Sequence, residues 1–368
     1  MKNILIPAMV GDTDSIIVQL ALEELGHVVH RLVGDNFPTR QTISYSISNA
    51  DLALGKFHDI NSGLSSDNID TVWLRRPRWP VISETLHPSD KFIAEEESKQ
   101  FIRSLYQTSW DSAIWVNSLE GKRRAGSKLL QLRVAAELGL IIPDTLVSNN
   151  PDEIRKFVKE KNDSAIVKPL MGGDWKENGK RYVTYTAAIS TAQLNDNEMI
   201  AACPCIYQNT IQKEYEVRAT FFGSTAIAVK LNSQDVKSGK LDWRIAEPHT
   251  LKISPIELPT EIYKKCISVM NKLGIIHGSF DFAVTGNGDW VFFEVNEAGQ
   301  FLWLEDYVPS LPVLQTAVEF LLNPSADFIM KNPGRRITIR EIVNSDKYKM
   351  SLLDDQKNVG SFKNTAII

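Results

Sequence analysis

Apolar and polar residues alternate most regularly between residues 279 and 296, on both sides of the segment T-G-N-G-D. Alternation around a glycine-containing turn predicts a β-hairpin. A four-residue loop pairs Thr285 with Trp290 and places Asp281 opposite Glu294. Because side chains two residues apart on a strand point the same way, one face of this hairpin is expected to be apolar. That face carries Phe280, Phe282, Val284, Val291, Phe293 and Val295.

The opposite face of the predicted hairpin is polar and carries Asp281, Glu294 and Asn296. Two carboxylates and an amide oxygen beside an apolar layer repel one another unless a cation joins them. Hard oxygen ligands of this kind suit Mg²⁺, which takes one or two carboxylates and leaves its other positions to water and phosphate. The alternative is a half-exposed hairpin with a polar outer face. The pairing across the hairpin and the Glu-x-Asn step favour a metal site.

The first 116 residues alternate predicted strands and helices, which is typical of an open α/β sheet. Strands are expected at 4–9, 27–33, 70–76 and 113–116, and helices at 14–25 and 90–110. The side chains of the second helix that are expected to face inward are Phe92, Phe101, Ile102 and Leu105. The third strand ends in Arg75, Arg76 and Arg78. These arginines could meet an acidic peptide, but we interpret them as solvated.

The middle of the chain carries a lysine that interrupts an apolar run. Lys168 stands in the predicted strand 165–170, where a lysine must be paired or solvated. The glycine-rich hairpin that follows contains Gly172 and Gly173. Such a hairpin can fold over a ligand and offer backbone N–H groups to phosphate oxygens.

A second hairpin is predicted around the turn at residues 223–224. In its first strand Glu216 and Arg218 are two residues apart and share a face. The remaining predicted elements are helices at 128–138, 151–161, 263–273 and 312–322 and strands at 141–147 and 204–211. The tail that follows residue 322 is polar and weakly patterned.

Composition places the chain among ordinary globular proteins. Its 368 residues are 43% hydrophobic, enough for two or three domains. A net charge of -4 gives no electrostatic footprint for nucleic acid, and no apolar run approaches the roughly 18 residues that span a bilayer. Three cysteines are too few for a disulfide framework, which favours a cytoplasmic protein. We interpret Cys203 and Cys205 as strand-interior residues rather than a metal or redox pair.

Taken in order, these features resemble the ATP-grasp ligases, in which two α+β lobes hold ATP between sheets. The matching residues are Lys128 at a helix start, Lys168 in a strand, the glycine-rich hairpin, a hinge strand for adenine at 205–211, and Asp281, Glu294 and Asn296 as a metal set. The resemblance implies an α/β and α+β protein with the ATP-grasp fold. Its parts are an N-terminal open α/β pre-ATP-grasp domain (1–117), a central lobe (118–203), a C-terminal lobe (204–322) and a tail of unknown role (323–368).

Within the ATP-grasp ligases, the chain is most similar to the graspetide macrocyclases of the microviridin type. The likeness rests on residues 128–149, on Y-Q-N-T-I-Q-K-E-Y-E-V-R-A-T (207–220), on N-S-Q and D-W-R (232–244) and on G-Q-F-L-W-L-E (299–305), and it spans about residues 1 to 322. The chain departs from the family at Lys230 and at Glu297-Ala298, where Pro-Asn is common.

This likeness implies cyclisation of a ribosomally made precursor peptide with a leader and a core that contains acidic and Ser or Thr residues. ATP would phosphorylate an Asp or Glu side chain, and a Ser or Thr hydroxyl of the same peptide would then close an ω-ester ring. Closure of an ω-amide with Lys is the alternative. The protein is further expected to be a homodimer that docks the leader near residues 117–124 or along an exposed sheet edge.

The resemblance also implies roles for single residues. Nucleotide binding is expected of Lys128, Lys168, Gly172, Gly173, Tyr207, Gln208, Asn209, Ile211, Glu216 and Arg218, and Mg²⁺ binding of Asp281, Glu294 and Asn296. The expected catalytic residues are Arg218 and Lys168. Substrate binding is expected of Arg218, Lys230, Asp242 and Arg244, with a structural ion pair as the alternative for Arg244.

Two other interpretations stay open at this point. An ATP-dependent ligase that adds glutamate or a similar amine would share every ATP and metal residue, and only D-W-R, N-S-Q and F-L-W-L-E argue against it. A nucleotide-binding scaffold without catalysis belongs to a different class of function. The intact set of lysines and metal ligands disfavours it.

Overall fold

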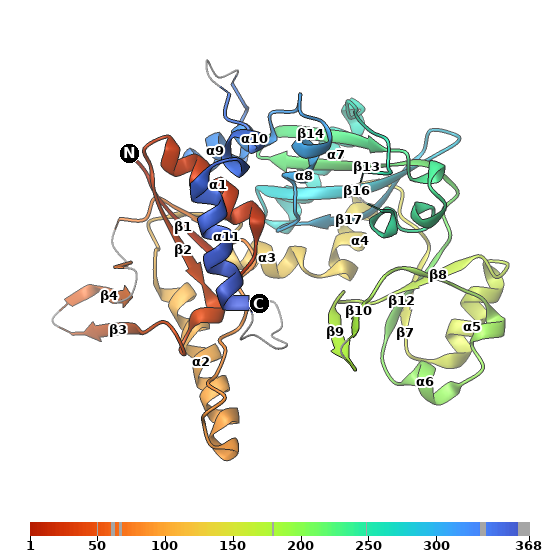
Figure 1. The fold of residues 1–368 in the computed structure, drawn as a ribbon. Coiled ribbons are helices and arrows are strands. Elements are labelled where there is room, and N and C mark those ends of the chain that lie inside the picture. The colour runs from red at the N-terminus through yellow and green to blue at the C-terminus, as the bar shows by residue number, and fades with distance from the viewer. Residues whose placement is uncertain are drawn as a thin grey trace.

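The computed structural model describes residues 1–49, 51–59, 63–65, 68–178, 180–247, 249–331 and 336–359. Parts of the expected tail (332–335 and 360–368) and residue 179 of the glycine-rich hairpin lie outside these ranges. Figure 1 shows the N-terminal sheet and the sheet of the central lobe on opposite sides of the molecule, with the largest sheet above them.

The N-terminal unit is built on a parallel sheet with the strand order β2-β1-β5-β6. Its strands are β1 (Asn3–Ala8), β2 (Val28–Val33), β5 (Thr71–Trp73) and β6 (Ile114–Val116), and its main helices are α1 (Thr13–Glu24) and α2 (Pro88–Thr108). Ile4 and Ile6 of β1 pack with α1, whereas Leu5 packs with α2 on the other face. Because both faces are covered, these strands are apolar runs, which made them predictable. A separate hairpin joins β3 (Ile43–Ser48) and β4 (Asp51–Asp59).

Helix α2 contacts its sheet only along its C-terminal half. Ile102 and Leu105 are buried and Phe101 is half-buried, as predicted. Phe92 is 74% exposed, so the prediction that it faces inward is wrong. The N-terminal half of the helix extends away from the sheet, as Figure 1 shows, and the described residues of α2 that join the core all lie in its C-terminal half.

The central unit carries a four-stranded sheet with the order β11-β8-β12-β7. Its elements are α3 (Leu119–Ala125), α4 (Lys128–Glu137), β7 (Thr145–Ser148), α5 (Pro151–Glu160), β8 (Ala165–Lys168), β9 (Asp174–Glu177), β10 (Lys180–Val183), β11 (Ala187–Ile189), α6 (Asn197–Ala201) and β12 (Cys205–Asn209). Helix α4 begins where the Ser127 side chain accepts a hydrogen bond from the backbone of Leu130, and it ends before Gly139, whose φ is +74°. Lys128 therefore opens a helix, as predicted.

The C-terminal unit is a five-stranded sheet with the order β15-β14-β13-β16-β17. Its elements are β13 (Lys213–Phe222), β14 (Thr225–Leu231), β15 (Ile253–Pro255), α7 (Thr260–Leu273), β16 (His277–Thr285) and β17 (Trp290–Asn296). One face of this sheet packs against α4 and α7, through Val217, Phe280 and Phe282 among others. The opposite face carries Arg218 and Asp281, which are partners across β13 and β16.

The predicted hairpin forms, but its register changes at a bulge. Asp281 pairs with Glu294 as predicted, whereas Trp290 pairs with Val284 rather than Thr285 because Phe293 is an extra residue in β17. The predicted apolar face is therefore wrong at Phe293 and also at Val291, which pairs with Ala283 on the face that carries Glu216. The bulge places Phe292 in the core instead and leaves Phe293 half-buried on the polar side.

The C-terminal segment returns to the N-terminal unit instead of forming a structureless tail. Its helices are α8 (Trp303–Tyr307), α9 (Val313–Leu322), α10 (Ile339–Val343) and α11 (Asp346–Val359). Figure 1 shows α11 lying alongside α1, and both α10 and α9 also contact α1. The buried Asp355 binds Arg31 and the backbone N–H of Gly11. The segment after residue 322 therefore completes the N-terminal core.

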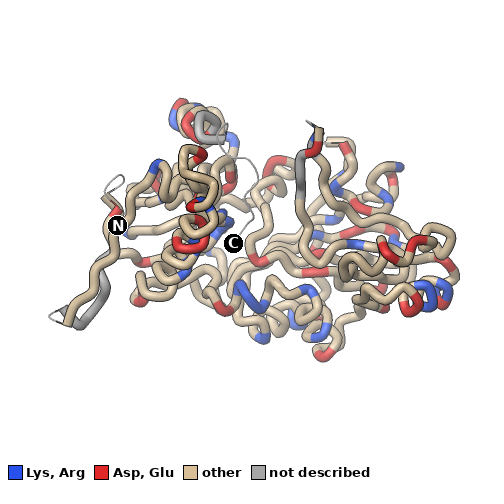
Figure 2. The backbone as a smooth tube through the Cα atoms, turned by 90° about the horizontal axis from the view of Figure 1, so that it is seen from below, with Lys and Arg blue, Asp and Glu red and all other residues tan. Residues whose placement is uncertain are grey.

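Two further predictions concern the surface. Cys203 is exposed and precedes β12, so the prediction of a strand-interior residue is wrong for it; Cys205 is half-buried within the strand. Figure 2 shows basic and acidic residues interspersed along the backbone. None of the helices in the described ranges has the length and apolarity needed to cross a bilayer.

Candidate active site

A cleft of about 540 Å³ lies where the three units meet. It is lined by eleven of the predicted site residues: Lys128, Lys168, Gly172, Gln208, Glu216, Arg218, Asp242, Arg244, Asp281, Glu294 and Asn296. These residues come from α4, β8, the loop between β8 and β9, β12, β13, β16, β17 and the segment after β14. The structure therefore brings together in one cleft predicted residues that are spread over about 170 residues of the chain.

Five predicted site residues do not line this cleft. The side chain of Tyr207 packs under α5, because neighbouring residues of β12 alternate in direction and Gln208 takes the cleft side. Asn209 and Ile211 lie farther along the same segment. The Gly173 N–H donates to the Thr184 side chain over 2.9 Å. Lys230 pairs with Val217 on the sheet face that packs against α4 and α7, and its Nζ lies 3.9 Å from the centre of the Tyr215 ring.

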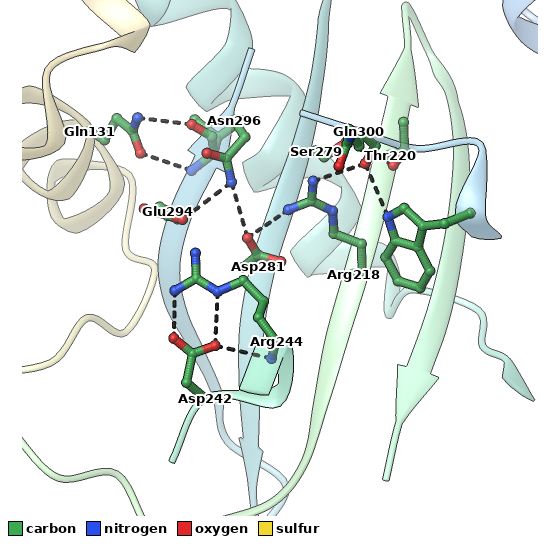
Figure 3. A network of polar contacts seen from close by, with 12 residues as sticks. Gln131, Arg218, Thr220, Asp242, Arg244, Ser279, Asp281, Glu294, Asn296 and Gln300 are labelled. Carbon is green, nitrogen blue, oxygen red and sulfur yellow. Dashed lines mark hydrogen bonds and ion pairs between the residues drawn. The ribbon is translucent and has the colours of Figure 1, made fainter. Parts of the chain in front are cut away.

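The predicted metal set converges as the hairpin register requires (Figure 3). Asn296 Nδ2 donates to Asp281 Oδ2 over 3.1 Å and to Glu294 Oε1 over 3.2 Å. Lys128 Nζ lies 3.6 Å from Glu294 Oε2. Two carboxylates and the Asn296 amide, whose nitrogen faces both of them, thus meet beside the cationic start of α4.

The electrostatics of this set fit a divalent cation. Burial raises the pKa of Asp281, although Arg218 opposes the rise, and Glu294 adds to it. Burial would also raise the pKa of Glu294, but Lys128 and Lys168, with a smaller contribution from Arg244, hold it below its ordinary value. Asp281 Oδ1 is buried and has no hydrogen-bond partner in the described part of the chain. A cation bound there would join both carboxylates and relieve their repulsion, so the residues present fit Mg²⁺.

Gln131 fixes the strand segment between two of these ligands, and the sequence analysis missed it. It projects from α4, accepts a hydrogen bond from the Val295 N–H over 2.8 Å and donates to the Val295 carbonyl over 2.9 Å (Figure 3). Because β17 is an edge strand, no neighbouring strand would otherwise bond these groups. Gln131 thereby sets the positions of Glu294 and Asn296. Gln131 lies one turn after Lys128 on the same predicted helix and therefore on the same helix face, and this spacing could have indicated from the sequence that it lies near the site.

Arg218 is held at the centre of the cleft. Its Nη1 donates to Asp281 Oδ2 over 2.7 Å, and its Nη2 donates to the Gln300 carbonyl over 3.3 Å. A Cβ placed on Gly299 would lie 2.6 Å from Nη2. The loop that follows Asn296 therefore approaches the guanidinium closely because residue 299 has no side chain.

Two further ion pairs line the cleft. Glu216 is buried and lies 2.9 Å from Lys213 Nζ; burial raises the pKa of its carboxyl although Lys213 opposes the rise. Arg244 forms a fork on Asp242, with distances of 2.8 Å from Nε and 2.6 Å from Nη2. Burial would raise the pKa of Asp242, but this pairing holds it below the ordinary value. Arg244 thus makes a structural ion pair and also lines the cleft, so both predicted roles remain compatible with its position.

An aromatic wall completes one side of the cleft. Trp243 and Trp303 have ring centres 5.2 Å apart, and Trp303 meets Tyr307 edge to face at 5.9 Å. Phe293, which the bulge turns towards the cleft, lies 6.0 Å from Lys168 Nζ. No spacing rule in the sequence singled out these rings, since they come from separate segments.

Arg75 corrects a prediction, because it is fully buried rather than solvated. It pairs with Asp12 over 3.1 Å and with Asp14 over 2.9 Å, and it donates to the carbonyls of Ala298 and Gly299 over 2.6 and 2.8 Å. Asp14 also accepts from the backbone N–H of Phe301 over 3.1 Å, whereas the adjacent Arg76 lines the cleft. The residues Asp12 and Arg75 follow the ends of neighbouring parallel strands, β1 and β5, which was the signal that could have paired them.

The site as a whole offers lysines for phosphate groups, oxygen ligands for a cation, and arginines for a carboxylate. Comparison with known proteins agrees with this chemistry. The profile of the MvdD pre-ATP grasp domain matches residues 3–123. Curated proteins give no sequence match.

Three solved structures resemble the chain over 88% of its length. A RiPP-associated ATP-grasp ligase of Chryseobacterium gregarium, in complex with ADP and a leader and core peptide, is 26% identical, with a TM-score of 0.80 and 98% of its chain covered. The macrocyclase MdnC of Microcystis aeruginosa MRC, bound with the precursor peptide MdnA, is 26% identical, with a TM-score of 0.76 and all of its chain covered (100%). MdnB of the same organism is 27% identical, with a TM-score of 0.73 and 100% covered. The chain is therefore an ATP-grasp ligase, an ATP-dependent enzyme that is similar to RiPP-associated macrocyclases.

Proposed function

We propose that the enzyme macrocyclises a ribosomally made precursor peptide by closing ω-ester bonds between Asp or Glu side chains and Ser or Thr hydroxyls. The observation that carries this proposal is that one cleft joins a phosphate and cation half (Lys128, Lys168, Asp281, Glu294, Asn296) to a half lined by arginines and aromatic rings. An extended acidic peptide matches that second half. The complexes of similar enzymes with leader, core and precursor peptides support the same substrate class.

In the first step, a carboxylate oxygen of the peptide attacks the γ-phosphorus of ATP, and the bond to the ADP oxygen breaks. Lys128 and Lys168 would hold the phosphates of ATP, and Arg218 would orient the attacking carboxylate. Asp281, Glu294 and Asn296 would hold Mg²⁺, which supplies positive charge against the crowded phosphate oxygens. Glu216 would hold the ribose or orient Arg218, and Gly172 and Gln208 would contact the nucleotide from the central unit.

In the second step, a Ser or Thr oxygen of the same peptide attacks the carbonyl carbon of the acyl phosphate. The bond from carbon to the phosphate oxygen breaks, and phosphate leaves with the hydroxyl proton. Each ring therefore costs one ATP and removes one water from the peptide. Asp242 and Arg244 also line the cleft, and Arg244, held by Asp242, would contact the acidic core.

The test is the intact mass of a candidate precursor peptide, encoded by a short neighbouring reading frame, after incubation with the enzyme, ATP and Mg²⁺. We expect the loss of one water mass per ring, with mild alkali restoring the mass if the bonds are esters. Asp281→Asn should abolish the loss, whereas Asp289→Asn, in the exposed loop of the same hairpin, should not. An unchanged peptide with ATP consumed on free glutamate would instead identify an amino-acid ligase. Light scattering would test the homodimer, which remains part of this proposal.

A further inference from the structure

One arginine of the cleft, Arg76, forms no ion pair with a carboxylate of the described residues. Three other cations of the cleft each lie near a carboxylate: Lys128 at 3.6 Å from Glu294, Arg218 at 2.7 Å from Asp281 and Arg244 at 2.6 Å from Asp242. The Arg76 guanidinium lines the same cleft but has no hydrogen bond or ion pair to any described residue.

The backbone at Arg76 is firmly held. Its neighbour Arg75 is fully buried and is bonded to two carboxylates and two carbonyls, and the Arg75 N–H donates to the Pro7 carbonyl over 3.1 Å. Pro77 follows directly and restricts Arg76 to an extended conformation. The backbone of Arg76 is therefore fixed before a ligand binds. A fixed backbone lowers the entropy cost of binding through the side chain.

Arg76 belongs to a group of charges with equal numbers of cations and anions, namely Arg75, Arg76, Lys122, Asp12, Asp14 and Glu297. Burial and the neighbouring Arg75 lower the pKa of Arg76, although Asp12, Asp14 and Glu297 oppose the fall. Burial also lowers the pKa of Lys122 on α3, where Arg76 and Arg75 act in the same direction and Glu297 opposes them. Asp12 and Asp14 bond directly to Arg75, whereas Glu297 interacts electrostatically with both Arg76 and Lys122. Because no carboxylate of the described residues forms an ion pair with Arg76, its guanidinium can bond to an anion that enters the cleft.

We propose that Arg76 binds a side-chain carboxylate of the substrate peptide and fixes one acidic core residue against the N-terminal unit. This inference rests on the proposed function. A guanidinium suits both carboxylate and phosphate, because its parallel N–H groups match two oxygens of either. Lys128 and Lys168 on the central unit would already bind the phosphates of ATP. Arg76 belongs to the N-terminal unit, so the peptide is its expected ligand.

The experiment measures steady-state cyclisation of the precursor peptide by the wild type, Arg76→Met and Arg78→Met. Arg78 is the matched control, because it lies two residues away but does not line the cleft. Loss of one charge-assisted contact should raise KM for the precursor about 10- to 100-fold in Arg76→Met. The KM for ATP and the ATP-induced shift in Tm should stay at wild-type values, and Arg78→Met should behave as the wild type.

A peptide series identifies the ligand. Each acidic core residue is replaced in turn by its amide, and we expect one replacement to raise KM in the wild type but to have no further effect in Arg76→Met. An unchanged precursor KM in Arg76→Met would overturn the inference, and so would an increase confined to the KM for ATP, which would assign Arg76 to phosphate.

Failure of the proposed function would give a different result. The wild type itself would then not cyclise the peptide. In that case, anisotropy of a fluorescein-labelled precursor with ADP and Mg²⁺ still gives a Kd, and equal Kd values for the wild type and Arg76→Met would overturn the inference. If free glutamate is consumed instead, the KM for glutamate takes the place of the precursor KM, with the same expected increase.

Discussion

The close approach of the 299–301 loop to Arg218 gives the sharpest prediction. In Gly299→Ala, the new methyl carbon would lie 2.6 Å from Arg218 Nη2 and 3.1 Å from Asn296 Cβ. The first distance requires a shift, and the end of the arginine side chain is the group that can move. Movement of that end breaks the 3.3 Å bond to the Gln300 carbonyl and disturbs the 2.7 Å bond to Asp281.

The expected magnitude follows from the bonds that are lost. A hydrogen bond to a charged group contributes about 1.5 to 3 kcal/mol, which corresponds to a loss of about 10- to 150-fold in kcat/KM for cyclisation. The fold should tolerate the change, because the displaced atom ends a flexible side chain and Gly299 does not have the positive φ that requires glycine. Tm should therefore fall by no more than a few degrees.

The assay compares Gly299→Ala with Gly286→Ala under saturating ATP and Mg²⁺. Gly286 lies in the exposed loop of the same hairpin, and a Cβ there would meet nothing within 4 Å. The control should keep wild-type kinetics. Wild-type kcat/KM in Gly299→Ala would refute the role of this loop in holding Arg218, and a large fall in Tm would show that the methyl group displaced the backbone instead.

Three other variants test the supports of the site. Arg75→Met leaves two buried carboxylates unpaired and should lower the free energy of unfolding by about 3 to 5 kcal/mol in urea titrations; a loss below about 1 kcal/mol would contradict the buried network. Gln131→Leu removes the hydrogen-bond partners of the Val295 N–H and carbonyl. It should raise the Mg²⁺ concentration needed for half-maximal activity. An unchanged Mg²⁺ concentration would mean that β17 positions Glu294 and Asn296 without Gln131. His277 is fully buried and burial lowers its pKa to about 3, so the unfolded chain gains a proton below pH 6.5 that the folded chain does not. Stability should therefore fall by roughly 2 kcal/mol between pH 6.5 and 5, and His277→Phe should remove that part of the slope unless the ring is protonated in the fold.

The sequence predicted the structure well where a local pattern determines which face of a strand a side chain occupies or where a helix begins. Alternation placed Asp281 opposite Glu294, and the predicted helix at 128–138 placed Lys128 at a helix start. The same parity applied across the turn at residues 223–224 pairs Lys230 with Val217 on the core face. The expected substrate role of Lys230 came from the family resemblance, and strand parity alone would have argued against it.

Other features depend on partners that local patterns do not reveal. The bulge at Phe293 adds one residue to β17 without a glycine or proline to mark it, so the predicted face failed there. Arg75 finds its carboxylates about 60 residues earlier in the chain and its carbonyl acceptors more than 220 residues later. Burial of a charge is decided by such distant partners, which is why solvation was the wrong interpretation.

The largest hydrophobic core has a consequence for the order of events during synthesis. It joins residues of β1 and α1 to Phe301, Leu314 and Ile342, so the earliest part of the chain and a part made some 300 residues later share one interior. At the rate of ribosomal synthesis, the apolar side of α1 stays exposed for on the order of tens of seconds before the C-terminal residues that bury it are made. The N-terminal unit thus emerges first but finishes folding late, and a chain broken off after β17 would expose the surface that α9, α10 and α11 normally cover.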